Sequence, residues 1–328
     1  MISTLELRQF RGLEHVRFGN LGRANLIVGG NNTGKTSVLE ALVMLIGSSK
    51  QLQALPTTFR AQPKQSQNPV PGFWRFLPKG SDPTQMLIDS DQGSVILENM
   101  KDEWRIQRST QGGNNLKLIV NVQPNGHLHI SETQSAQRLS ILSTDQPDPA
   151  EVSELFNQIA PLNPENETKL EDLLRRSIEP RLRRLRYAKP QGTHTHLVYV
   201  DLGNGPMLPF TQLGQAFART LQVYCEIFAN RPEILLIDEI ENGLYYEGLE
   251  DYWKGLLAVL EDQDVQLFAT THSRECMEAA HRAAVPLDDD PLRFLRLDRR
   301  VDDPAKIVAT TFGKDEMQTA IEFNREMR

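Results

Sequence analysis

Residues 29–36 read Gly29-Gly30-Asn31-Asn32-Thr33-Gly34-Lys35-Thr36 and fit the pattern G-x-x-x-x-G-K-[ST] at every position. A short apolar run, Asn25–Val28, precedes this stretch, and the apolar residues of Val38–Ile46 after it have helical spacing. A glycine-rich turn between a buried strand and a helix is the context in which this motif binds phosphate. The backbone N–H groups and the helix N-terminus supply partial positive charge there. The stretch therefore predicts a P-loop nucleotide-binding fold.

The side chains of this loop have separate predicted roles on a nucleoside triphosphate. Lys35 is placed to reach the β- and γ-phosphates, and the Thr36 hydroxyl is placed to bind Mg²⁺. A chance glycine-rich turn is the alternative, and the flanking strand and helix argue against it. The predicted ATP-binding residues of the loop are Gly29, Gly30, Asn31, Asn32, Thr33, Gly34, Lys35, Thr36 and Ser37.

A second apolar run, Ile234–Ile237, ends in the two carboxylates Asp238 and Glu239. Ligands of parallel α/β sheets collect at the carboxyl ends of the strands, so both side chains are predicted to face the nucleotide. Asp238 is predicted to hold Mg²⁺, and Glu239 is predicted to polarise the attacking water. Taken in isolation, the pair could be two solvated acids; together with the phosphate loop it indicates a nucleoside triphosphatase.

The next apolar run, Val265–Ala269, ends in Thr270-Thr271-His272-Ser273. A histidine at the same sheet edge can sense the γ-phosphate and orient water. A single histidine after a strand is more often structural, but this one follows the acidic pair by one strand–helix–strand unit. The predicted catalytic residues are therefore Glu239, His272 and Lys35.

The whole-chain composition excludes several classes of protein. Of 328 residues, 39% are hydrophobic and 24% are charged, which excludes disordered, collagen-like and disulfide-scaffold chains. The net charge of −7 limits any nucleic-acid contact to a local patch. Only two cysteines occur, no run reaches the ~18 apolar residues of a membrane helix, and the first residues lack a signal peptide. We therefore expect a cytoplasmic protein without membrane contact.

The hydrophobic pattern predicts an α/β chain in three parts. Residues 1–140 are expected to form an N-terminal ATPase lobe with the P-loop, a proline-rich, lid-like loop over Gln51–Pro83 and an antiparallel β patch. Residues 141–188 are expected to form a helical insertion broken by Pro161 and Pro164. Residues 189–328 are expected to form a C-terminal lobe, where strands alternating with amphipathic helices imply a parallel sheet.

These motifs in this order resemble the ABC-type ATPase head shared by the SMC, RecF and OLD families. The opening LELRQFRGL at Leu5–Leu13 is similar to the "FRG" start of those heads. LIDEIENGL at Leu236–Leu244 and ATTHS at Ala269–Ser273 resemble most closely the bacterial OLD-like ATPases of the AAA family, many of them associated with phage defence. The resemblance spans roughly residues 1–50 and 190–325.

The resemblance implies ATP and Mg²⁺ as cofactors and a homodimer that forms head to head on ATP binding. It adds Arg11 to the ATP site and makes Glu241, Asn242, Gly243 and Leu244 a D-loop at the dimer seam. The signature segment, which contacts the partner's γ-phosphate, corresponds to Phe210–Ala216. Its contact residues would be Thr211, Leu213, Gly214 and Gln215.

Three departures from the family pattern bear on hydrolysis. Tyr245 replaces the family's D-loop histidine, and the signature lacks the usual Ser-Gly-Gly. An ordinary helix start capped by Thr211 is the alternative reading of that segment. The only candidate for a Q-loop glutamine is Gln85, within a proline-rich region. A non-hydrolysing, ATP-gated scaffold is therefore one alternative function.

We expect neither a long coiled coil between the two halves of the predicted head nor a Toprim domain after them. The resemblance therefore implies an ATPase that is the motor or sensor of a DNA-directed or phage-defence complex. A separate protein, such as a nuclease, would be the effector. A RecF-like DNA repair ATPase with its own DNA-binding face is the other alternative.

The concentrated basic stretch of this acidic chain is Arg175–Lys189, with seven Lys or Arg residues in fifteen positions. Arginine suits phosphate contact, and in related heads a helical arm extends from this place. A solvated face paired with nearby acids is the competing interpretation. The candidate contacts to nucleic acid or a partner are Arg181, Arg183, Arg184 and Arg186.

Overall fold

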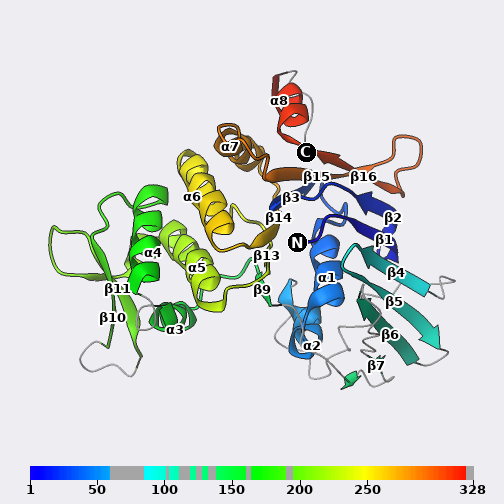
Figure 1. Cartoon of the computed structure of the whole chain (residues 1–328), viewed down its shortest axis with the longest axis horizontal. Coiled ribbons are helices and arrows are strands. Elements are labelled where there is room, and N and C mark those ends of the chain that lie inside the picture. Colours follow the sequence, from blue (N-terminus) through cyan, green and yellow to red (C-terminus); the bar gives the residue numbers. More distant parts are fainter. Residues whose placement is uncertain are drawn as a thin grey trace.

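The computed structural model describes residues 1–59, 85–100, 103–110, 119–122, 128–131, 138–159, 164–189 and 195–322. The molecule is elongated, with two large sheets at one end and a helical part with a small sheet at the other (Figure 1). No described helix is both long and apolar enough to cross a bilayer. The mixed α/β architecture confirms the predicted fold class.

A six-stranded sheet in the order β16-β15-β3-β14-β13-β9 forms the centre of the molecule. All neighbours are parallel except β16, which is antiparallel to β15. Alternate residues of β3 serve two hydrophobic cores, because Leu26 faces one and Ile27 the other. Its strands are β3 (Ala24–Gly29), β9 (Leu139–Leu142), β13 (Ile234–Ile237), β14 (Gln266–Thr270), β15 (Leu292–Arg299) and β16 (Ile307–Phe312).

A seven-stranded antiparallel sheet, in the order β2-β1-β4-β5-β6-β7-β8, confirms the predicted β patch and adds the N-terminal hairpin to it. Helix α1 (Lys35–Ile46) packs between the two sheets, and eleven of its twelve residues are buried. The strands are β1 (Leu5–Phe10), β2 (Leu13–Phe18), β4 (Gln85–Ser90), β5 (Gly93–Met100), β6 (Glu103–Thr110), β7 (Ile119–Val122) and β8 (Leu128–Ser131).

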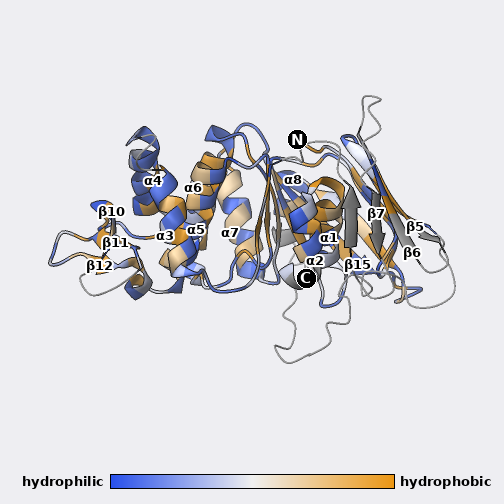
Figure 2. Cartoon of the chain, turned by 90° about the horizontal axis from the view of Figure 1, so that it is seen from below, coloured by the Kyte–Doolittle hydropathy of each residue, from blue (hydrophilic) through white to orange (hydrophobic). Residues whose placement is uncertain are grey.

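Helices α3 to α7 lie on the opposite side of the six-stranded sheet, away from α1 and α2 (Ser49–Thr58) (Figure 2). A three-stranded antiparallel sheet, β10-β11-β12, closes this end of the molecule. The two predicted helices around Pro161 and Pro164 are confirmed as α3 and α4. The elements here are α3 (Pro149–Ile159), α4 (Pro164–Ser177), α5 (Gln215–Asn230), α6 (Leu249–Asp262), α7 (Arg274–Ala284), β10 (Arg184–Ala188), β11 (Leu197–Asp201) and β12 (Leu208–Pro209); α8 (Lys314–Glu322) follows β16.

Two predicted segments differ from the structure. The loop expected from Gln51 begins instead as a helix, α2 (Ser49–Thr58), because Ser48 and Gln51 form a capping box and Leu52 and Leu55 are buried. The rest of that predicted loop, residues 60–83, lies outside the described residues. The expected helical insertion, 141–188, ends in strand β10, which forms a hairpin with β11.

The packing of α6 against α4 and α5 gives a testable prediction at Gly255. A Cβ at this position would overlap the hydroxyls of Ser177 and Tyr224, which hydrogen-bond each other at 2.7 Å in the core. Gly255→Ala gains about 1 kcal/mol of helix propensity, yet overpacking should lower the free energy of unfolding by a net ~1–2 kcal/mol. Urea unfolding measured by circular dichroism is the test. Gly248→Ala is the matched control, since open space surrounds Gly248, and equal midpoints for the two variants would contradict the packing.

Candidate functional site

The P-loop and the end of β14 form one pocket. It has a volume of about 320 Å³ and is lined by residues 31–37 and His272. Gly29 and Gly34 hold the loop in shape with φ of 140° and 95°, values that favour glycine. A Cβ on Gly29 would overlap the Leu297 carbonyl oxygen, and one on Gly34 would lie 2.8 Å from the side chain of Leu13. The loop can therefore turn tightly onto a phosphate.

The ammonium of Lys35 lies inside the loop. Its Nζ donates hydrogen bonds of 2.8 Å to the carbonyl oxygens of both Gly29 and Gly30. Burial lowers the pKa of Lys35, while the nearby carboxylates of Asp238, Glu239 and Glu241 oppose this by favouring its charged form. The loop therefore presents a positive charge next to the acidic strand end, as a triphosphate with a divalent cation requires.

The carboxylate of Asp238 meets two hydroxyls. Thr270 Oγ1 donates to Asp238 Oδ1 at 2.6 Å, and the nearby Thr36 hydroxyl also helps to lower the pKa of Asp238. Burial raises the pKa of Asp238, and these hydroxyls and the charges of His272 and Lys35 counter the rise. Mg²⁺ prefers oxygen ligands and keeps several waters and phosphate oxygens beside one or two protein ligands. The Thr36 and Asp238 oxygens fit that ion, although the described residues contain no cluster of three His, Cys, Asp or Glu suited to a metal.

Glu239 has a strained backbone that its neighbours hold. Its φ is +50°, in the left-handed region that non-glycine residues seldom adopt. The N–H of Glu239 donates to Thr270 Oγ1 at 2.8 Å, and the N–H of Ile240 donates to the Thr270 carbonyl oxygen at 3.0 Å. One threonine therefore orients the carboxylate of Asp238 and also fixes the turn that carries Glu239.

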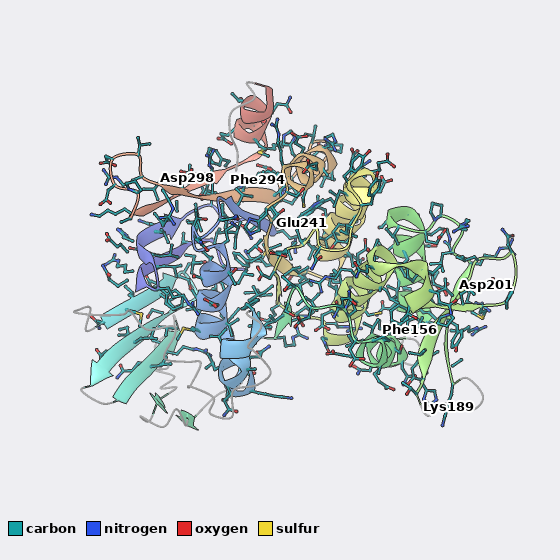
Figure 3. All side chains as sticks on the ribbon, turned by 180° about the vertical axis from the view of Figure 1, so that it is seen from behind. Phe156, Lys189, Asp201, Glu241, Phe294 and Asp298 are labelled. Atoms are coloured by element: carbon teal, nitrogen blue, oxygen red, sulfur yellow. The ribbon has the colours of Figure 1, made fainter. Side chains whose placement is uncertain are left out.

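The predicted D-loop lies next to both His272 and the signature segment. Glu241 Oε1 accepts a hydrogen bond of 2.9 Å from the His272 N–H, and Figure 3 shows Glu241 in the middle of the molecule. Gly243 has a φ of +81°, and a Cβ on it would lie 3.2 Å from Gln215 Cβ. The structure thus brings the end of β13, the end of β14 and the start of α5 together.

The signature segment forms a short 3₁₀ helix, Phe210–Leu213, followed by Gly214 at the N-cap of α5 with a φ of +90°. No side chain caps α5, so the alternative reading of Thr211 as a helix cap is wrong. Leu213 is partly buried, while Thr211, Gly214 and Gln215 are exposed. None of these residues lines the P-loop pocket.

The turn after β9 joins these parts, and the sequence analysis missed it. The N–H of Asp238 donates to the Leu142 carbonyl at 3.0 Å, and Asn242 Nδ2 donates to the Thr144 carbonyl at 2.9 Å. Arg219 of α5, only 4% exposed, donates to the Ser143 carbonyl at 2.7 Å. No local pattern in the sequence marks this turn, because its side-chain contacts join residues that lie 76 and 98 positions apart in the chain.

Three candidates from the sequence lie away from the pocket walls. The partly buried Arg11 forms an ion pair of 2.6 Å with Glu40 of α1. Gln85 lies on β4 and donates to Glu98 of β5 at 3.2 Å, within the seven-stranded sheet. The basic residues Arg181, Arg183, Arg184 and Arg186 lie in and before β10, at the far end of the molecule (Figure 1).

The role of Thr270 is testable by Thr270→Val. Losing the hydroxyl leaves a buried carboxylate oxygen and the Glu239 N–H without their partner, at a cost of ~1–3 kcal/mol for each unsatisfied group. We expect ATP turnover, measured as phosphate release at saturating ATP, to fall at least about tenfold. Thr270→Ser keeps the hydroxyl and should stay within a few fold of wild type; equal turnover in all three proteins would contradict the role.

Comparisons with known sequences match two AAA families. Residues 117–278 match a family described as "AAA domain, putative AbiEii toxin, Type IV TA system", and residues 1–134 match one described as "AAA ATPase domain". A Helicobacter pylori protein named ATP/GTP phosphatase is 21% identical over 324 residues, which cover 85% of this chain and 87% of that protein. An uncharacterised protein of Methanocaldococcus jannaschii is 40% identical over 50 residues, 15% of this chain and 23% of that protein.

Comparison with solved structures shows the fold. The crystal structure of an Smc head bound to the C-winged helix domain of ScpA covers 97% of this chain and 99% of that chain, with a TM-score of 0.57 and 13% identity. At this identity the likeness concerns the fold alone. The chain is therefore similar in sequence to AAA-family ATPase domains and has the ABC-type P-loop NTPase fold of an SMC head.

Proposed function

We propose that this chain hydrolyses ATP with Mg²⁺ and that ATP binding closes two copies of it head to head. The observation that carries the proposal is the separation of two half-sites. The P-loop pocket contains no residue of the signature segment, while Thr211, Gly214 and Gln215 are exposed beside the D-loop. A nucleotide on one copy is completed by the exposed segment of the second, an arrangement of two-fold symmetry.

Within one copy, we assign a separate role in ATP hydrolysis to each group of residues. The backbone N–H groups of residues 31–36 and the ammonium of Lys35 bind the phosphates. Thr36 and Asp238 hold Mg²⁺, which neutralises charge that develops on the transferred phosphoryl group. Glu239 orients and deprotonates the attacking water, and His272 contacts the γ-phosphate from the pocket wall. The product is ADP and phosphate, formed by transfer of the phosphoryl group to water.

Across the seam, the second copy supplies the remaining contacts. Its Gly214 N–H and Thr211 hydroxyl face the γ-phosphate, and its D-loop borders the P-loop. Because ATP is part of this interface, the γ-phosphate gives the closed state its additional affinity. Arg11 belongs to the proposed ATP site through α1, which it contacts at Glu40.

We further propose a separate effector protein, such as a nuclease, in a cytoplasmic phage-defence or other DNA-directed complex. Two comparisons support this. One matched AAA family is described with a toxin of a type IV toxin–antitoxin system, and the Smc head of the same fold was solved bound to a domain of ScpA. The absence of the usual Ser-Gly-Gly from the signature segment favours one alternative, an ATP-gated scaffold that binds ATP without turnover.

ATP binding is tested by Lys35→Ala. The variant loses the positive charge inside the loop and should bind ATP at least ~100-fold more weakly, which corresponds to about 2.7 kcal/mol. The measurement is titration with a fluorescent ATP analogue in the presence of Mg²⁺. Lys254→Ala removes an exposed lysine of α6 and should bind as wild type does. Wild-type affinity in the Lys35 variant would refute the assignment of the pocket.

Dimerisation is tested by Glu239→Gln, which removes the water-activating carboxylate and keeps the contacts to phosphate and Mg²⁺. The variant should bind ATP, release no phosphate and shift by light scattering to twice the mass of the monomer, whereas ADP should leave the mass unchanged. Adding Thr211→Trp, a change at an exposed position, should restore the monomer mass without loss of ATP binding. If the variant binds ATP but its mass does not change when ATP is added, the two-copy arrangement is excluded.

A further inference from the structure

The hairpin β10–β11 has two different faces. Leu185, Val198 and Val200 face the helices and are buried, and Tyr187 on the same side hydrogen-bonds Glu154 of α3. The residues between them face outward. On that outer face Arg184 lies opposite Asp201, and Arg186 lies opposite Tyr199, which in turn lies opposite Pro209 of β12.

The arginines at this hairpin differ in whether a carboxylate neutralises them. Arg181 is held by both oxygens of Glu179, each at 2.9 Å. By contrast, the exposed guanidinium groups of Arg183, Arg184 and Arg186 have no hydrogen bond or ion pair with any residue that the structure describes. The competing interpretation of the segment as a self-paired charged surface therefore holds for Arg175, which pairs with Asp172, and for Arg181. Of the other three, Arg184 has a longer-range attraction to Glu171 but no ion pair.

The acids nearest to these arginines are already engaged. The Asp201 carboxylate accepts a hydrogen bond of 2.7 Å from the Gly203 N–H, and Glu171 accepts one of 2.7 Å from the Leu185 N–H. Gly203 has a φ of +80°, and a Cβ on it would overlap the guanidinium of Arg183, so that group rests against the bare backbone. Three guanidinium groups without an ion pair are thus exposed on neighbouring residues, with the Asp201 carboxylate opposite Arg184, in a chain with a net charge of −7.

The spacing of the free arginines suits a polyanion with a regular repeat. Arg184 and Arg186 are two residues apart on one strand, which places their Cα atoms about 6.6 Å apart. Successive phosphates of an extended nucleic-acid strand have a similar separation. Tyr199 lies beside Arg186 and is partly exposed, so it offers an aromatic ring next to the phosphate contacts. A cationic groove with an aromatic platform is the usual design for single-stranded nucleic acid.

We propose that the outer face of the β10–β11 hairpin binds single-stranded nucleic acid. Arg184 and Arg186 contact successive phosphates, Arg183 adds a third positive charge beside Gly203, and a base stacks on Tyr199. In Figure 3, Asp201 and Lys189 lie at the end of the molecule away from Phe294 and Asp298 of β15, so a strand reaches this face without passing the nucleotide pocket. This proposal goes beyond the ATPase function and does not depend on it.

The test uses the full chain and a fluorescein-labelled oligothymidylate of twenty nucleotides, with affinity measured by anisotropy at several salt concentrations. R183Q/R184Q/R186Q should weaken binding at least about tenfold at low salt and reduce the slope of log affinity against log salt by about 2. Tyr199→Ala should weaken binding about tenfold, and Tyr199→Phe should not. Thermal melts and ATP turnover without oligonucleotide verify that each variant is folded.

The matched control, R8Q/R17Q/K306Q, removes the same charge from the opposite end of the molecule and should bind as wild type does. Equal weakening by both triple variants, or no binding by wild type at any salt, would overturn the proposal. Duplex DNA bound more tightly than the oligothymidylate, or poly-glutamate bound as tightly, would also overturn it, the latter in favour of an acidic protein partner. ATP turnover is scored separately, so the two proposals fail independently.

Discussion

Parallel pairing of β3, β14 and β13 is the constraint on which the site depends. The register places Leu26 beside Ala269 and Ala269 beside Ile237, so three strands from distant parts of the chain end at one sheet edge. Only because these ends coincide can the P-loop after β3 and the histidine after β14 line one pocket, with the carboxylates after β13 close enough to act on the charge of Lys35. Their strands are buried on both faces, which makes this edge rigid.

Two hydrophobic cores make that register stable. Leu236 and Phe268 face α1 on one side of the sheet, and Leu235 and Leu267 face the helices on the other. A slip of one residue in any of these strands would exchange the two sets of side chains and would move each proposed catalytic group by one position. The chemistry therefore depends on the packing of side chains that never contact the nucleotide.

The sequence sufficed for the parts of the site that lie within short motifs. Each of these motifs stands at the end of a strand: the residues from Gly29 to Thr36, the acids after β13, and His272. The end of a strand can be predicted from local hydrophobicity. Helix α2 was missed because prolines outweighed the capping box formed by Ser48 and Gln51, which is a local signal.

The remaining misses are contacts between distant residues. Arg219 meets the turn after β9 although 76 residues separate it from Ser143, and no pattern in a single sequence reports such a pair. The strand β10 was missed because the family resemblance places a helical arm at this position. The alternation of exposed and buried residues in β10 becomes meaningful only once β11 pairs with it.

The turn at residues 142–144 has a thermodynamic consequence for the whole molecule. Through its carbonyl oxygens it holds the backbone of Asp238, the D-loop residue Asn242 and, by Arg219, the helix behind the signature segment. A displacement of any one of these three elements must therefore shift the other two, because all three are hydrogen-bonded to the same turn. Linkage makes such coupling reciprocal: in the proposed two-copy arrangement, the free energy that ATP contributes to association is returned by association as tighter retention of ATP.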